Sequence, residues 1–263
     1  MAGFLVAAGL YGFAAAVMWG TNRPPLAEAA LLQAGTSLLA FGLATWVFGM
    51  RVARLSPEQL RWAPGGGRGF LAGLPLGIAP AAVAMAVAVP LAGAAWAPDG
   101  GTFADWLGTF AVTTALLFPA AFVEELIFRG VPQVVLGEAF GRGTAIVVLS
   151  AVFALAHGLN PGITPLAVGN IALAGVLLGV SFYLPGGIWA ATGVHLGWNA
   201  TLAALAAPVS GLPFAMPWLD YRSGEPAWLS GGGFGPEGGL LGTAVLAIAV
   251  LAAWRLVRAS ASR

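Results

Sequence analysis

Long apolar runs, separated by short breaks rich in Gly, Pro and Arg, fill most of the 263-residue chain. Only 8% of the residues are charged and 59% are hydrophobic, whereas soluble domains carry about 25% charged and about 45–50% apolar residues. So few charged side chains cannot cover the surface of a water-exposed globule of this size. The sequence therefore predicts an integral membrane protein.

A helix needs about 20 apolar residues to cross the hydrocarbon layer of a bilayer, which is about 30 Å thick. We therefore expect an all-α fold, a polytopic membrane helix bundle of about eight transmembrane helices that forms one domain over residues 1–263. The predicted spans are residues 2–20, 26–50, 70–96, 105–129 or beyond, 143–159, 166–184, 187–209 and 239–257. The connecting loops are too short to form a second domain.

The distribution of Arg predicts the orientation of the bundle, because short cytoplasmic loops retain basic residues. The loop after the second predicted span contains four of them: Arg51, Arg54, Arg61 and Arg68. With eight spans, both termini are then cytoplasmic. A cleavable signal peptide is the alternative for residues 1–20, and the lack of a basic segment before this apolar run favours a span. The Arg-only, Ala- and Gly-rich composition indicates a bacterial cytoplasmic membrane.

Charge and cysteine content exclude several functions. A net charge of +1 argues against a nucleic-acid partner, because binding phosphates requires clustered basic residues. The absence of cysteine excludes disulfides, thiolate metal sites and cysteine nucleophiles. Gly73 and Gly77 in one span, and Gly175 and Gly179 in another, have the four-residue spacing that lets helix backbones approach closely, so we expect them to serve packing.

A few ionisable residues lie inside predicted spans, where a charged or imidazole side chain is costly and usually faces an interior cavity. Glu124 and Glu125 are adjacent in the fourth span, and Arg129 follows them. His157 and His195 are the only two histidines of the chain. These residues are our candidates for a functional site.

Glu125 and Arg129 are four residues apart with the acid first, which is the favourable order for a helical ion pair. Glu124 is rotated by about 100° from its neighbour, so it can point elsewhere and serve as a general base. A buried Glu–Arg pair that only orients helices is the structural alternative. Asn170, isolated in the sixth span, is expected to form a helix–helix hydrogen bond.

Both histidines have a neighbour on the same helix face, since His157 follows Phe153 by four residues and Asn199 follows His195 by four. We expect Phe153 to serve packing. If the fourth helix continues past Arg129 to a turn near residues 140–143, Glu124 and His157 lie roughly 21–24 Å from that turn on antiparallel helices and can face each other.

The order Glu124-Glu125-x-x-x-Arg129, Phe153-x-x-x-His157 and His195-x-x-x-Asn199 on separate membrane helices resembles the CPBP family of intramembrane proteases. This family comprises the type II CAAX prenyl endopeptidases and the bacteriocin-processing or Abi-type membrane proteins, and the resemblance covers about residues 105–209.

The resemblance implies a glutamate-dependent peptide hydrolase that uses no covalent nucleophile. Glu124 and His157 would activate a water, while His195 and Asn199 would stabilise the oxyanion. Glu125 and Arg129, which complete the first motif, are assigned to orienting and charge-balancing this site. A hydrophobic or lipid-modified peptide would be the substrate, with membrane lipids around the protein. The oligomeric state is not predicted.

Three alternatives remain open from the sequence. Two histidines and a glutamate are also a zinc ligand set, although a His-Glu-x-x-His motif is absent, and we favour a site without a metal cofactor. A non-catalytic immunity or peptide-export partner protein is the second alternative. A proton-coupled transporter is the third, and the lack of an inverted repeat disfavours it.

Overall fold

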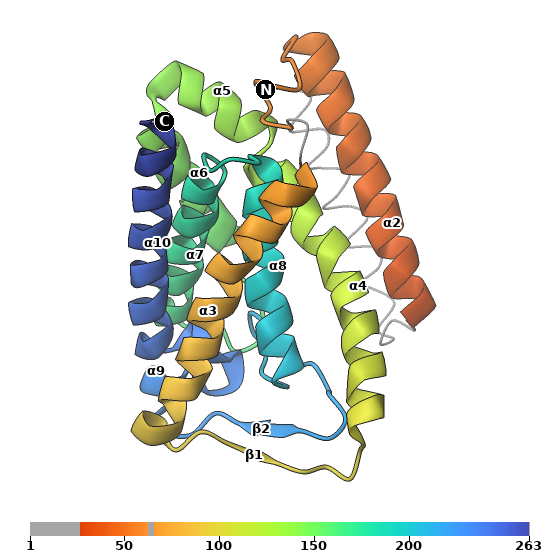
Figure 1. The fold of residues 1–263 in the computed structure, drawn as a ribbon, viewed down its shortest axis with the longest axis vertical. Coiled ribbons are helices and arrows are strands. Elements are labelled where there is room, and N and C mark those ends of the chain that lie inside the picture. The colour runs from red at the N-terminus through yellow and green to blue at the C-terminus, as the bar shows by residue number, and fades with distance from the viewer. Residues whose placement is uncertain (1–26, 63–65, 263) are drawn as a thin grey trace.

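The computed structural model describes residues 27–62 and 66–262, and most of this part of the chain is helical (Figure 1). The long helices are α2 (Ala27–Ala44), which continues as the π-helix η1 (Thr45–Val52), α3 (Gly66–Ala92), α4 (Phe103–Phe128), α5 (Val131–Phe140), α6 (Arg142–Ala156), α7 (Pro165–Ser181), α8 (Ile188–Ala204) and α10 (Leu240–Ala261). Short elements complete the chain: β1 (Ala95–Ala97), β2 (Asp220–Arg222), α9 (Ala227–Ser230), η2 (Gly232–Phe234) and η3 (Pro236–Gly238). The helical fold class is confirmed.

The predicted number of eight spans is not confirmed. Within the described residues, four helical segments are long and apolar enough to cross a membrane: Ala34–Val52, Gly66–Ala92, Phe103–Phe140 and Leu240–Ser260. Three further helices that overlap predicted spans, α6, α7 and α8, have only 15, 17 and 17 residues. The predicted spans were longer because they included apolar loop residues beyond the helix ends. The first predicted span, residues 2–20, lies outside the described residues.

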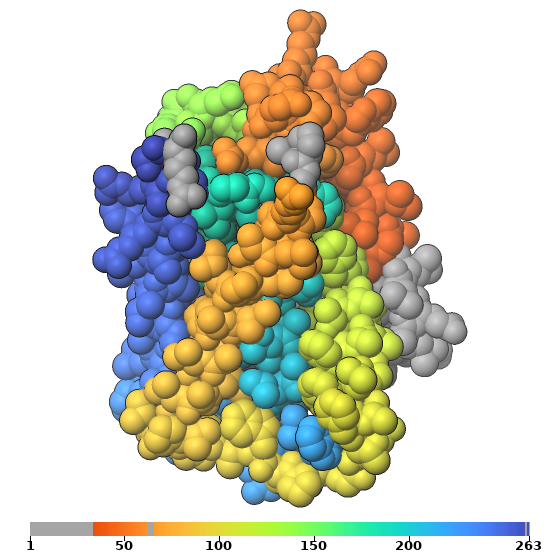
Figure 2. Space-filling model, viewed as in Figure 1, coloured from red at the N-terminus to blue at the C-terminus, as the bar shows by residue number. Residues whose placement is uncertain are grey.

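Helix α8 lies at the centre of the bundle, with α3, α4 and α7 packed around it (Figure 1). Residues 190–198 of this helix are all buried, and Ile188, Leu202 and Ala203 are buried as well. In the space-filling view α3 crosses the front of the bundle, and α8 is visible between α3 and α4 (Figure 2). A polar side chain on α8 is therefore held inside the protein.

Glycines allow α3 to pack directly on the backbone of α8. A Cβ atom on Gly73 would lie 2.2 Å from the carbonyl oxygen of Ala190, and one on Gly77 would lie 2.0 Å from that of Val194. In the second pair, a Cβ on Gly175 would lie 2.9 Å from the Cα of Ser150 on α6. The predicted packing role of these glycines is confirmed.

We expect Gly77→Ala to destabilise the protein, because the added methyl group overlaps the α8 backbone next to His195. Overpacking of this kind costs about 1–3 kcal/mol. Gly108→Ala on α4 is the matched control, since nothing lies within 4 Å of a Cβ there, and it should be neutral or stabilising by up to about 1 kcal/mol. Thermal unfolding in detergent measures both. Equal unfolding temperatures for the two variants would contradict the direct α3–α8 contact.

The fourth helix ends close to the predicted residue 129 and does not run unbroken to residue 140, so the condition for the predicted depths of Glu124 and His157 is not met. Helix α4 ends at Phe128, and the chain turns at Gly130 before α5 begins with Pro132 in its first turn. A Cβ on Gly130 would lie 2.5 Å from the carbonyl oxygen of Leu126, and a proline supplies no N–H to extend a helix through it. Helix α5 therefore starts as a separate element across one end of the bundle (Figure 1).

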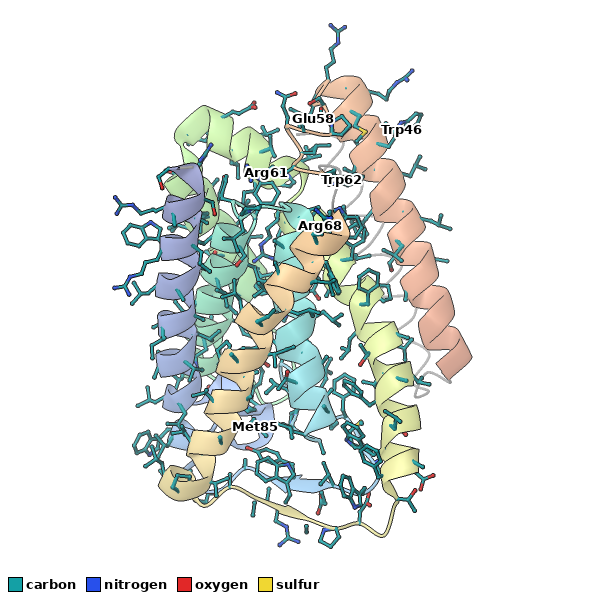
Figure 3. All side chains as sticks on the ribbon, viewed as in Figure 1. Trp46, Glu58, Arg61, Trp62, Arg68 and Met85 are labelled. Atoms are coloured by element: carbon teal, nitrogen blue, oxygen red, sulfur yellow. The ribbon has the colours of Figure 1, made fainter. Side chains whose placement is uncertain are left out.

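Arginines lie at one end of the bundle. Arg61 and Arg68 lie at the end where α5 crosses, whereas Met85 lies on α3 towards the other end (Figure 3). At that other end Ala95–Ala97 pairs antiparallel with Asp220–Arg222. The arginine-rich end is the one that the sequence predicts to face the cytoplasm, and the orientation itself stays a prediction.

Candidate active site

The ionisable residues predicted to lie within spans come from three helices. Glu124 and Glu125 lie near the C-terminal end of α4, His157 directly follows the last residue of α6, and His195 lies in the middle of α8. The carboxyl groups of both glutamates are within 4.0 Å of an imidazole nitrogen. The structure thus brings these four side chains into one cluster.

The Glu124 carboxylate lies between the two imidazole rings. Its Oε2 is 3.7 Å from Nε2 of His195 and 4.0 Å from Nε2 of His157. These separations exceed the hydrogen-bond range of about 2.7–3.2 Å. The oxygen is buried and has no hydrogen-bond partner among the described residues, while the Glu124 side chain as a whole is 33% exposed. Glu124 therefore has an unused acceptor beside both histidines and remains accessible to a small molecule.

The orientation of His157 is fixed by the backbone of α6. Its Nδ1 lies 2.8 Å from the carbonyl oxygen of Phe153. A carbonyl only accepts hydrogen bonds, so Nδ1 of His157 donates to it and Nε2 faces Glu124. The Phe153 ring packs edge-on against Phe128 at 5.1 Å, which fits its predicted packing role. Its carbonyl adds a contact that the spacing did not predict.

The orientation of His195 is fixed by a carboxylate instead. Its Nδ1 lies 2.8 Å from Oε1 of Glu125, and both side chains are buried. Nδ1 donates to this carboxylate, so Nε2 again faces Glu124. A carboxylate in this position also stabilises the protonated imidazolium, which can donate a hydrogen bond from Nε2.

Arg129 balances the charge of Glu125, as the spacing predicts. Its Nη1 lies 3.3 Å from Oε1 of Glu125, and its Nη2 donates to the carbonyl oxygen of Gly175 on α7 at 3.1 Å. The guanidinium also lies over the Phe153 ring, 4.6 Å from its centroid. The predicted ion pair is therefore present, and it connects α4 to α7 as well as to His195.

Asn199 lies one turn beyond His195 on α8 and is partly buried. No hydrogen bond between described residues uses its side-chain amide. Residues four apart share a helix face, so Asn199 follows His195 along the same side of α8. Its assignment to an oxyanion site stays a prediction.

The side chains around Glu124 include the donor types that the zinc alternative requires. Imidazole nitrogens and a carboxylate are suitable zinc donors, and here they converge from Glu124, His157 and His195. Within residues 27–62 and 66–262, however, no group of three or more His, Cys, Asp or Glu side chains is arranged to hold a metal ion.

A second buried carboxylate besides that of Glu125, on Glu237, was not among the candidates from the sequence. It is 4% exposed and lies in η3, just before α10. No pattern in the sequence marks Glu237, because it lies in a loop rich in Gly and Pro where charged residues are usually solvated. Asn170, by contrast, forms the predicted helix–helix hydrogen bond, since Oγ1 of Thr243 on α10 donates to its Oδ1 at 2.7 Å. Its amide also donates to the carbonyl oxygens of Glu237 and Gly239.

The structure thus combines a cluster of glutamates and histidines with an all-helical fold whose longest helices can cross a membrane. Residues 106–201 match the model of the family described as type II CAAX prenyl endopeptidase Rce1-like. This region contains all six predicted site residues, and it confirms the resemblance to the CAAX proteases, a family of membrane proteins. Neither the curated proteins nor the solved structures yield a match.

Proposed function

We propose that this protein is an intramembrane endopeptidase that hydrolyses a peptide bond in a membrane-associated, hydrophobic or lipid-modified peptide. The observation that carries the proposal is the position of Glu124. Its Oε2 has no hydrogen-bond partner in the described part of the chain and lies within 4.0 Å of the Nε2 atoms of both histidines. The match of residues 106–201 to a family of proteases supports it.

In the proposed reaction a water molecule binds beside Glu124 and His157. Glu124 removes a proton from the water, and the resulting hydroxide attacks the carbonyl carbon of the scissile peptide bond. His157 Nε2 accepts a hydrogen bond from the same water and orients it. A general base contributes typically about 10²–10⁴-fold to a rate.

The negative charge that develops on the carbonyl oxygen is stabilised by donors on α8. Protonated His195 donates from Nε2, and the amide of Asn199 donates from one turn further along. The tetrahedral intermediate collapses when the peptide C–N bond breaks and Glu124 returns its proton to the leaving amine. Each donor aimed at an oxyanion is worth about 10²–10³-fold.

Glu125 and Arg129 act as positioning residues in this proposal. Glu125 holds His195 through Nδ1 and stabilises its protonated form, and Arg129 compensates the charge of Glu125. Because the carboxylate and guanidinium are buried, this part of the site is preorganised before a substrate binds.

The experiment that tests this proposal searches for the substrate among the peptides of the membrane. Membranes that contain the wild-type protein or Glu124→Gln are compared by mass spectrometry of new peptide termini. The proposal predicts at least one peptide that is cleaved with the wild-type protein and accumulates uncleaved with the variant. Identical termini in both membranes, together with an unchanged biological phenotype, would favour the non-catalytic partner function.

We expect cleavage to survive the removal of metal ions. Carbonyl activation in the proposed site comes from hydrogen-bond donors, so purified protein treated with a chelator should retain its rate within about twofold, since a lost catalytic metal would cost several kcal/mol of transition-state stabilisation. Metal analysis of the active protein is the accompanying measurement. Stoichiometric zinc, with activity lost on chelation and restored by zinc, would establish the metal-dependent mechanism instead.

We also propose that the protein resides in a bacterial cytoplasmic membrane with its arginine-rich end in the cytoplasm. The support is the position of Arg61 and Arg68 at the α5 end of the bundle, opposite the paired strands (Figure 3). This orientation follows the retention of basic residues by short cytoplasmic loops.

A further inference from the structure

Glu237 lies outside the family match and uses both of its carboxylate oxygens inside the protein. Oε1 accepts a hydrogen bond from Nε1 of Trp198 at 3.1 Å. Oε2 accepts from Oγ of Ser210 at 3.1 Å and also from the backbone N–H of Ser210. This carboxylate therefore links α8 to the loop that follows α8.

The bond to Trp198 connects Glu237 to the oxyanion side of the proposed site. Trp198 immediately precedes Asn199 and follows His195 by three residues on the buried helix α8. Its ring is 6% exposed. By holding the indole N–H, Glu237 fixes the turn of α8 that carries Asn199.

The bonds to Ser210 connect Glu237 to the loop that carries His157. The Asn160 side-chain amide donates to the carbonyl oxygen of Ser210 at 2.8 Å, and the Asn160 backbone N–H donates to the carbonyl oxygen of His157 at 3.0 Å. Burial raises the pKa of Glu237, and the bonds from Ser210 and the charge interaction with His157 oppose this shift. Ser210 and Asn160 thus connect the Glu237 carboxylate to the backbone of His157.

The backbone around Glu237 is itself anchored. The Asn170 amide on α7 donates to the carbonyl oxygens of Glu237 at 2.8 Å and of Gly239 at 2.9 Å. Thr243 on α10 donates from Oγ1 to Oδ1 of Asn170 at 2.7 Å. Helices α7 and α10 therefore fix the point from which Glu237 reaches Trp198 and Ser210.

We propose that Glu237 is a positioning residue of the active site that sets the placement of His157 and Asn199 relative to each other. The inference rests on the proposed function for its catalytic consequence. Glu237 is not proposed as a catalytic residue, because Trp198 and Ser210 occupy its oxygens. His195 is held separately, by Glu125, and should not depend on Glu237.

The presence of only two histidines allows a direct test on the full-length protein in detergent. Labelling with ¹⁵N-histidine gives one set of imidazole signals for His157 and one for His195. Glu237→Gln places an amide N–H₂ opposite the donors of Trp198 or Ser210 and so disrupts these bonds. The variant should therefore shift the His157 signals and leave those of His195 in place. Glu138→Gln, at an exposed carboxylate on α5, is the matched control and should move neither.

A second variant keeps the test decisive if Glu237→Gln folds poorly. Asn160→Ala removes the link between the His157 loop and Ser210 without altering the carboxylate, and it should also shift only the His157 signals. Unchanged His157 signals in the folded variants, or His195 signals that move as much, would overturn the proposal.

Activity provides the second readout, with a prenylated CAAX-box peptide carrying a fluorophore and a quencher as the probe. We expect Glu237→Gln to lower kcat about 10- to 100-fold with KM unchanged, because misplacement of a catalytic group affects the transition state. A wild-type kcat in the variant would overturn the proposal. If wild-type protein cleaves neither this probe nor any membrane peptide, the proposed function fails, and the histidine spectra still decide whether Glu237 positions His157.

Discussion

Replacing Glu124 by Gln is expected to abolish peptide hydrolysis while leaving the fold intact. The amide has the same shape as the carboxylate but cannot accept a proton from water, so the general base is lost. Because such a base contributes about 10²–10⁴-fold, we expect kcat to fall about 1,000-fold. The measurement is the initial rate of cleavage of the quenched prenylated peptide in proteoliposomes.

Glu138→Gln is the control for this substitution. Both variants remove one carboxylate, but Glu138 is exposed on α5 and outside the cluster around the histidines. The control should keep the wild-type rate, and both variants should unfold at the wild-type temperature. A Glu124→Gln protein that keeps more than about a tenth of the wild-type rate would exclude Glu124 as the general base.

The helices could be predicted because apolar residues form runs whose lengths approach the thickness of a membrane. The runs predict that helices are present, but they predict the ends of those helices less well. Residues 95–97 belong to an apolar run and yet form a strand, because they pair with residues 220–222, which are more than a hundred positions away. The break at Gly130 was visible as Gly-x-Pro in the sequence, but the apolar residues around it favoured one continuous helix.

The site was predictable to the extent that its contacts are local in the sequence. The Glu125–Arg129 pair follows from helical spacing and is present. The bond between Glu125 and His195 spans 70 positions, so no periodicity indicates it. Glu237 was missed for a related reason: a charged residue in a loop is normally solvated, and only the folded loop shows that it is buried.

Removing either member of the Glu125–Arg129 pair is expected to destabilise the protein strongly. Glu125 is 0% and Arg129 is 1% exposed, so Arg129→Met leaves a buried carboxylate without its guanidinium, and Glu125→Gln leaves a buried guanidinium without its carboxylate. Breaking a buried ion pair on one side costs about 3–5 kcal/mol. Thermal unfolding in detergent should show this loss in both single variants.

The double variant Glu125→Gln/Arg129→Met separates folding from catalysis. It contains no unpaired buried charge, and replacing a whole buried ion pair is often neutral, so it should recover most of the stability lost in the single variants. Its activity should remain low, because the amide can still accept from Nδ1 of His195 but no longer stabilises the imidazolium that donates to the oxyanion. A double variant that regains wild-type kcat together with its stability would show that the pair only supports the fold and that His195 needs no carboxylate.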